Sequence, residues 1–181
     1  VVRVVDEALA LAPAAQTIRA TDVDHDGDLD LLTESALFTA NGDGSWRRQT
    51  EGLEALSSDA VSVLPMDLDQ DRDRDLVVVG QQGLWVIRND RIWQWESLQI
   101  DDEPAQAVVG GDPNADGVVD LYVLRSETLD HFEVLRDLSL VRKYRTELEG
   151  MHSMMLADFS GDGRLELFCS GDSSAFVYSI D

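Results

Sequence analysis

The chain has 181 residues, of which 44% are hydrophobic and 28% are charged. This composition is typical of one globular domain rather than a disordered or membrane-spanning chain. The formal net charge is −22 with only 14 lysine and arginine residues, which argues against nucleic acid as a partner because phosphate contacts need basic patches. No apolar run approaches the roughly 20 residues of a membrane-spanning helix, so membrane insertion is not expected.

Short β-prone runs follow one another along the whole chain, beginning with Val1–Val5. They group into four units of similar layout, and a tight hairpin turn is expected at Asn41–Gly44 in the first unit. The expected strands are 17–20, 31–32 and 46–50 in the first unit; 61–64, 76–79, 84–87 and 92–95 in the second; 107–109, 121–124, 129–134 and 138–141 in the third; and 153–156, 167–169 and 175–178 in the fourth.

An acidic loop separates the first two strands of every unit, at residues 22–30, 67–75, 112–120 and 158–166. The first positions of these loops are 45, 45 and 46 residues apart. A repeat of this length suits one four-stranded blade of a β-propeller. The sequence therefore predicts an all-β fold, with residues 1–181 forming a single propeller domain.

The two ends of the chain complement each other. Val1–Val5 aligns with the outer strand 46–50 when the frame is shifted by one repeat, and the fourth unit stops after its third strand. The prediction is a propeller of four antiparallel four-stranded blades in which the N-terminal strand completes the last blade and removes its exposed edge. The alternative is four consecutive blades of a larger propeller.

The acidic loops have the chemistry of a calcium site. Positions 1, 3, 5 and 9 of each loop offer side-chain oxygens, and position 7 can offer its backbone carbonyl; such hard ligands suit Ca²⁺. Glycine at position 6 (Gly27, Gly117, Gly163) permits the positive φ that bends the loop. Without a cation, each like-charge pair about 4 Å apart costs on the order of 4 kcal/mol at an effective dielectric constant near 20. The competing interpretation is an acidic turn held by side-chain to backbone hydrogen bonds.

These loops, Asp-x-Asp-x-Asp-Gly-x-x-Asp in a β context, resemble the FG-GAP repeats of integrin alpha-subunit propellers and the related VCBS repeats of bacterial proteins. The resemblance covers essentially the whole chain, and the missing Phe-Gly and Gly-Ala-Pro landmarks favour the VCBS-like branch. It implies a calcium-binding β-propeller that serves in adhesion or interaction, in an extracellular, periplasmic or cell-surface setting.

Carried over by position, the resemblance implies four sets of calcium ligands. They are Asp22, Asp24, Asp26, Asp30 and the carbonyl of Asp28; Asp67, Asp69, Asp71, Asp75 and the carbonyl of Asp73; Asp112, Asn114, Asp116, Asp120 and the carbonyl of Val118; and Asp158, Ser160, Asp162, Glu166 and the carbonyl of Arg164. Arg72 replaces the glycine of the second loop and is expected to be strained or to change the turn. Ser160 and Glu166 are expected to weaken the fourth site.

Other chemistry is poorly supported by the sequence. No pattern pairs His25, His131 or His152 with a nucleophile, so no catalytic residue and no organic cofactor is predicted, and the chain is expected not to be an enzyme. Trp93 and Trp95 share one strand face and predict either packing between blades or a platform for a sugar or protein. The interpretation left open beside the adhesion scaffold is a carbohydrate-binding or hydrolytic propeller whose pocket lies opposite the acidic loops. The partner is unknown, and an oligomer or a longer parent chain would complete a larger ring.

Overall fold

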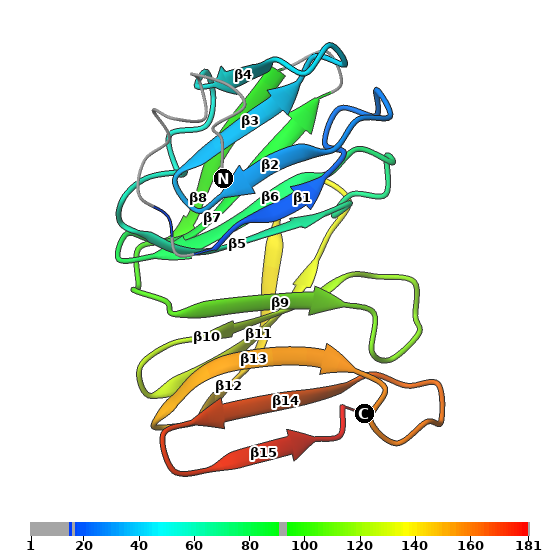
Figure 1. Cartoon of the computed structure of the whole chain (residues 1–181). Coiled ribbons are helices and arrows are strands. Elements are labelled where there is room, and N and C mark those ends of the chain that lie inside the picture. The colour runs from blue at the N-terminus through cyan, green and yellow to red at the C-terminus, as the bar shows by residue number, and fades with distance from the viewer. Residues whose placement is uncertain (1–14, 16, 91–93, 181) are drawn as a thin grey trace, which may run out of the picture.

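The computed structural model describes residues 15, 17–90 and 94–180, and every regular element in this part of the chain is a β-strand. The strands form four antiparallel sheets that follow one another along the chain (Figure 1). Sheet 1 contains β1 (Arg19–Thr21), β2 (Asp30–Thr33), β3 (Ala36–Ala40) and β4 (Trp46–Gln49), and sheet 2 contains β5 (Ala60–Met66), β6 (Asp75–Gly80), β7 (Gly83–Asp90) and β8 (Gln94–Asp101). Sheet 3 contains β9 (Ala107–Gly111), β10 (Asp120–Leu124), β11 (Thr128–Val134) and β12 (Leu140–Glu147), and sheet 4 contains β13 (Met151–Ala157), β14 (Glu166–Gly171) and β15 (Ala175–Tyr178). The expected all-β fold is confirmed.

Within every sheet the strands pair in chain order, so each sheet is a meander. Two strands, one in the third unit and one in the second, differ from their expected bounds. The strand expected at 138–141 begins at Leu140, because Leu138 has a φ of +63° and its N–H closes a turn on the Leu135 carbonyl. The strand expected at 92–95 corresponds to β8, which continues to Asp101; residues 92 and 93 lie outside the described residues. The expected N-terminal strand, Val1–Val5, lies outside the described residues, as does Trp93.

Three hydrophobic cores hold consecutive sheets together. Leu32 and Leu37 of sheet 1 meet Leu76 and Ile87 of sheet 2 in the first core. The other two cores repeat this arrangement between sheets 2 and 3 and between sheets 3 and 4. Strand alternation explains the pattern, since successive residues of one strand point to opposite faces. Val77 of β6 therefore packs toward sheet 3 while Val78 packs toward sheet 1.

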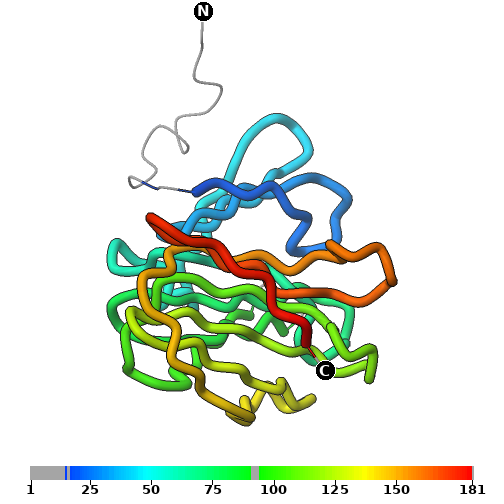
Figure 2. The backbone as a smooth tube through the Cα atoms, turned by 90° about the horizontal axis from the view of Figure 1, so that it is seen from below, coloured from blue at the N-terminus to red at the C-terminus, as the bar shows by residue number. Residues whose placement is uncertain are grey.

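The series of sheets has two ends. Sheet 4 has three strands, and β15 is its last one. This strand lies at the bottom of Figure 1. It lies in front in Figure 2, which views the molecule from below. In the described part of the chain, none of the three cores joins sheet 4 to sheet 1. The described residues thus form four sheets packed in sequence.

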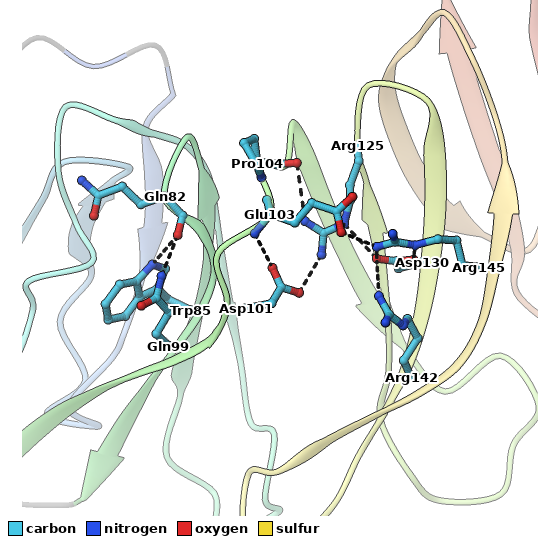
Figure 3. A network of polar contacts seen from close by, with 10 residues as sticks. All are labelled: Gln82, Trp85, Gln99, Asp101, Glu103, Pro104, Arg125, Asp130, Arg142 and Arg145. Carbon is cyan, nitrogen blue, oxygen red and sulfur yellow. Dashed lines mark hydrogen bonds and ion pairs between the residues drawn. The ribbon is translucent and has the colours of Figure 1, made fainter.

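A buried ion network ties sheets 2 and 3 together at the ends of the strands opposite the acidic loops (Figure 3). The guanidinium of Arg125, which follows β10, donates to Asp130 Oδ2 at 2.8 Å within sheet 3 and to Asp101 Oδ2 at 2.7 Å at the end of β8. It also donates to the backbone carbonyls of Glu103 and Pro104. Arg145 closes the network by bonding both oxygens of Asp130 and reaching Glu103 Oε2 at 2.6 Å.

Candidate metal centre

The four acidic loops occupy equivalent places in the fold. Each one joins the first strand of its sheet to the second, so β1 leads into β2 through residues 22–30 and the other three sheets follow suit. All four loops project from the same side of the molecule, the right-hand side of Figure 1. Because the sheets pack in sequence, the loops form one acidic rim.

Each loop is bent by two residues in the left-handed region of backbone conformation, at positions 4 and 6. Position 6 has φ between +82° and +95° in all four loops, and the expected positive φ of its glycines is confirmed. Arg72 adopts the same conformation at +82°, so the second loop keeps the turn and holds a strained non-glycine residue. Position 4 has positive φ as well, on residues His25, Gln70, Ala115 and Gly161.

The backbone amides of the loop turn inward onto its own side chains. The amide at position 6 donates to Oδ2 of the position 1 aspartate in every loop, for example Gly27 to Asp22 at 3.2 Å and Gly163 to Asp158 at 2.9 Å. The amide at position 7 donates to Oδ1 at position 5, as from Asp28 to Asp26 at 2.8 Å. These bonds fix the carboxylates in the concave side of the loop and confirm the hydrogen-bonded turn that the competing interpretation requires.

The acid at position 9 anchors each loop to the following strand. Asp30 Oδ2 accepts the Val23 amide at 2.8 Å, and its Oδ1 accepts the Ala40 amide of β3 at 3.0 Å. Asp75 repeats both contacts in the second loop. Glu166 takes the same role in the fourth loop, where its longer side chain accepts the Phe159 amide at 2.7 Å. Glu166 therefore preserves the loop geometry despite its departure from aspartate.

The third loop is anchored differently because its second residue is Pro113, which has no amide hydrogen. Its position 9 acid, Asp120, instead contacts His131 Nε2 at 2.7 Å. The His131 ring stacks on Tyr122, with centroids 4.8 Å apart and planes 6° from parallel. The proline in the sequence was the available signal for this replacement.

Three of the loops bring acidic side chains close enough to share an ion. Each member of a group places one carboxylate oxygen within 4.8 Å of the others. The groups are Asp22, Asp24 and Asp30; Asp67, Asp69 and Asp71; and Asp158, Asp162 and Glu166. Asp22 Oδ1, Asp24 Oδ2 and Asp67 Oδ1 are buried and have no hydrogen-bond partner in the described part of the chain. Buried, unpaired carboxylate oxygens that face other carboxylates are the arrangement that a divalent cation relieves.

Burial raises the pKa of several of these acids. The pKa of Asp24 rises to about 6, because burial and the charges of Asp30, Asp26 and Asp22 outweigh the hydrogen bond from the Asp26 amide. The pKa of Asp75 rises to about 7, again chiefly by burial and against the hydrogen bonds from Asn89 and Leu68. Burial also raises the pKa values of Asp30, Asp69 and Asp120. Burial therefore disfavours the charged form of these five carboxyl groups.

The remaining expected ligands are less closely gathered. Asp26 lies in the first loop and Asp75 in the second, but neither belongs to the three acids of its loop whose carboxylate oxygens approach one another. In the third loop, the described residues bring no group of three acids together, and Asn114 Nδ2 instead donates to Asp116 Oδ2 at 3.0 Å. At position 7, the amides of Asp28, Asp73, Val118 and Arg164 all donate within the loop. Ser160 contributes its amide to Glu166 Oε2 at 3.4 Å.

Contacts between neighbouring loops were not expected from the sequence. The Asn89 side chain of β7 donates to the Val23 carbonyl in the first loop at 3.0 Å and to the Arg74 carbonyl in the second at 3.3 Å. Gln70 of the second loop donates to the Gly117 carbonyl of the third. The sequence carried no signal for Asn89, which stands between Arg88 and Asp90 at the polar end of β7. The loops are therefore linked through backbone atoms of their neighbours.

Two further residues are buried in the cores. Trp95 is 9% exposed and packs in the core between sheets 1 and 2, as the interpretation of packing between blades requires. Cys169 is buried in the core between sheets 3 and 4, and burial raises the pKa of its thiol to about 11. Among the described residues, no helix has the length and apolar character needed to cross a membrane.

Comparison with known proteins gives a likeness in fold alone. No family model matches the chain, and no curated protein sequence does. The chain is similar in fold to a solved structure of an Agrocybe aegerita lectin, described as recognising non-reducing terminal N-acetylglucosamine, with a TM-score of 0.57 and 17% sequence identity. The likeness covers 88% of this chain and 48% of the lectin, so the chain spans about half the length of that protein.

Proposed function

We propose that this chain is a calcium-binding β-propeller repeat module of the FG-GAP and VCBS type, acting as a non-enzymatic scaffold for interaction or adhesion. The main support is the set of buried, unpaired oxygens Asp22 Oδ1, Asp24 Oδ2 and Asp67 Oδ1. Burying a charged oxygen without a partner is costly, and a cation removes that cost. Ca²⁺ fits the donor set because it takes roughly six to eight oxygens in flexible geometry.

The ion's role in this proposal is structural: it neutralises the carboxylates and stabilises the bent loop. The chain's own hydrogen bonds hold the loop in its bent conformation and join it to the sheet. Position 1 and position 5 acids receive backbone amides, and the position 9 acid joins the loop to the sheet, as Asp30 does through Val23 and Ala40. An ion that binds only the folded loop adds stability by mass action. The first two loops, which have the unpaired oxygens, are proposed as the tightest sites.

In the same proposal, the four sheets are consecutive blades of a propeller, and their common acidic rim is its calcium side. The packing of each sheet on the next supports this arrangement, as does the likeness in fold to a protein of greater length. Sites built from exposed loops suit a calcium-rich setting outside the cytoplasm, where weak to moderate affinity is sufficient.

Calorimetric titration with Ca²⁺ tests the proposal. The wild-type chain is expected to release or absorb heat and to melt at a higher temperature in Ca²⁺ than in chelator. Asp24→Asn removes one charge from the first loop and should lower the number of sites and the calcium-dependent part of the melting shift. Asp172→Asn is the matched control, because the Asp172 side chain is 93% exposed and lies outside the loops. If titration released or absorbed no heat and chelator did not change the melting temperature, the proposal of calcium binding would be contradicted.

Carbohydrate binding is the second candidate, and a different part of the molecule favours it. At the ends of the strands opposite the acidic rim, Gln82, Trp85 and Gln99 lie together (Figure 3). The Gln82 carbonyl accepts Trp85 Nε1 at 3.3 Å and Gln99 Nε2 at 2.9 Å, and a shallow pocket beside them is lined by Asp59, Gln82 and Trp85. An aromatic ring beside amide groups offers an apolar face together with hydrogen-bonding groups, and a sugar ring can use both.

A glycan array that includes terminal N-acetylglucosamine tests this candidate. Binding that Trp85→Phe preserves, that Trp85→Ala abolishes and that chelator leaves unchanged would assign the ligand to this surface. Binding lost only in chelator would place it at the acidic rim instead. An array without any signal would leave the structural calcium module as the sole function supported.

A further inference from the structure

The side chain of Asn89, at the end of β7, joins the first acidic loop to the second. Its amide nitrogen carries two hydrogens. It donates to the Val23 carbonyl of the first loop at 3.0 Å and to the Arg74 carbonyl of the second at 3.3 Å. Asn89 is only 6% exposed, so water does not readily replace either hydrogen bond. The two loops therefore share one buried donor.

Both carbonyls that Asn89 contacts lie next to acids of the proposed calcium sites. Val23 immediately precedes Asp24, whose Oδ2 is buried and has no hydrogen-bond partner among the described residues. Arg74 immediately precedes Asp75, the acid that anchors the second loop. The backbone amide of Asn89 also donates to Asp75 Oδ1 at 3.0 Å. A movement of the backbone at either site is therefore transmitted to Asn89.

Strand register shows that this donor is specific to sheet 2. Asn89 lies two residues beyond Ile87, which pairs with Leu76, the first residue after the second loop. The same count in the other three sheets leads to Ala40, Val134 and Ile180. None of these three residues has a side chain that can donate a hydrogen bond. The asparagine is therefore a departure from the repeat, placed where two acidic loops meet.

We infer that Asn89 couples the first two calcium sites, so that an ion bound in one loop raises the affinity of the other loop. The inference rests on the calcium binding proposed above. An ion that orders the first loop fixes the Val23 carbonyl and, through it, the Asn89 side chain. The Arg74 carbonyl of the second loop is then held before a second ion binds, so that ion pays less for ordering its site. We expect a change in affinity of about fivefold, the lower end of coupling between sites, because one side chain carries it.

Electrostatic effects between the two loops act in addition to this link and have to be separated from it. A cation in one loop makes the potential at the other less negative, which opposes binding of a second cation. Salt weakens this effect, since the Debye length falls from about 10 Å at 0.1 M to about 3 Å at 1 M. His25 Nε2 also lies 3.9 Å from Asp73 Oδ1, a distance beyond a hydrogen bond. Both contributions remain when only the Asn89 side chain is changed.

Nuclear magnetic resonance of the full chain measures the occupancy of each loop separately. The amides of Gly27 and Arg72 report on the first and second loops, because each donates at 3.2 Å to the position 1 aspartate of its own loop. The Gly163 amide reports on the fourth loop in the same way. Free Ca²⁺ is varied with a chelator buffer at roughly 0.5 M salt, and the midpoint of each amide shift is recorded. Asp24→Asn should raise the midpoint of Gly27 directly and that of Arg72 about fivefold, and should leave that of Gly163 unchanged.

The matched comparison repeats this measurement without the link. In the Asn89→Ala background, Asp24→Asn should still weaken the first loop but should leave the midpoint of Arg72 unchanged. Asn89→Val, which introduces the residue that sheet 3 has at the equivalent position, provides a second variant should Asn89→Ala fail to fold. Asn41→Ala is the control, because the Asn41 side chain bonds Ser45 Oγ within its own turn at 2.9 Å. The effect of Asp24→Asn on Arg72 should persist in that control.

Coupling between two binding sites is reciprocal. Asp69→Asn in the second loop should therefore raise the midpoint of Gly27 by the same factor, and only when Asn89 is present. If Arg72 responds to calcium but not to Asp24→Asn, or if its response to Asp24→Asn persists without the asparagine, the inference is overturned while calcium binding stands. If no loop amide responds to calcium, the proposed function is contradicted and the coupling with it.

Discussion

Arg125 and Asp130 form an ion pair of 2.8 Å in which the first side chain is 2% exposed and the second is fully buried. From this pair Arg125 also reaches Asp101 of sheet 2, so one guanidinium joins two sheets (Figure 3). Burial acts to raise the pKa of Asp130, but hydrogen bonds from Arg145 and Arg125 hold it below its ordinary value. Both side chains are therefore charged in the folded protein, and each buried charge is stabilised by the opposite charge of its partner.

Truncating Arg125 should be strongly destabilising. Arg125→Ala leaves Asp130 buried with Arg145 as its main partner, and breaking a buried pair in this way costs about 3–5 kcal/mol of unfolding free energy. Urea denaturation measures the loss. Arg142→Ala is the matched control, because Arg142 is 48% exposed and lies 3.7 Å from the same carboxylate; its cost should stay below about 1 kcal/mol. Equal losses in the two variants would contradict the importance given to burial.

Stability without calcium should fall as the pH rises from about 4 to 7. The pKa values of Asp24 and Asp75 are about 6 and 7 in the folded chain, above the ordinary 3.8, so the folded state binds more protons than the unfolded state in this range. The chain in chelator should thus melt at a higher temperature at pH 5 than at pH 7.5. Ca²⁺ should weaken or reverse this trend, since it replaces the protons.

The variant Asp75→Asn isolates this effect, because an amide does not titrate. In chelator it should melt with less dependence on pH than the wild type between pH 5 and 7.5. Asp172→Asn, at a fully solvated position, should behave as the wild type does. If wild-type melting temperatures had the same pH dependence in chelator and in Ca²⁺, the loop carboxylates would not be the groups responsible.

Arg72→Gly should stabilise the protein. Arg72 has a φ of +82°, a conformation that costs a residue with a side chain roughly 1 kcal/mol and glycine very little. The gain is reduced by the greater freedom of glycine in the unfolded chain, so an increase of about 0.5 kcal/mol is expected by urea denaturation. Arg74→Gly, two residues further and without a positive φ, should instead destabilise. A loss of stability in Arg72→Gly would show that the arginine side chain outweighs its strain.

The third loop offers a test of compensation between two residues. His131→Leu removes the contact of Asp120 at 2.7 Å and should cost about 1–3 kcal/mol, because a buried acid loses its partner. Adding Pro113→Val restores an amide at the position from which Val23, Leu68 and Phe159 bond the anchoring acids of the other loops. The double variant should recover part of the loss. His152→Leu, at an exposed histidine, is the control and should change stability little.

Absence of recovery in the double variant would contradict the account of this loop. If Pro113→Val alone stabilised the protein by as much as it does beside His131→Leu, the two residues would act independently. The melting temperatures of these variants in chelator provide a second measurement of stability, because chelator removes any contribution of bound calcium.

The sequence by itself determined the repeating unit and the composition of its loops. Short, continuous runs rich in β-branched residues, such as Leu76–Val79, favour a strand buried on both faces, and the regular recurrence of the acidic motif predicted where each pair of strands is joined. The positive φ at Gly27, Gly117 and Gly163 followed from the chemistry of glycine in a tight loop. These features depend on residues close together in the chain, which is why local patterns predicted them.

Only the tertiary structure decided which distant residues meet. Arg125 finds Asp101 across two sheets, Asn89 bonds the carbonyl of Val23, and His131 takes the place of the amide that Pro113 lacks. Each of these contacts joins groups brought together by the packing of sheets, and no local pattern encodes that packing. The same holds for the cross-strand row Met155–Phe168–Val177, in which Met155 and Val177 are about half exposed. Its exposure comes from its position at the end of the series, where the described chain supplies no further sheet.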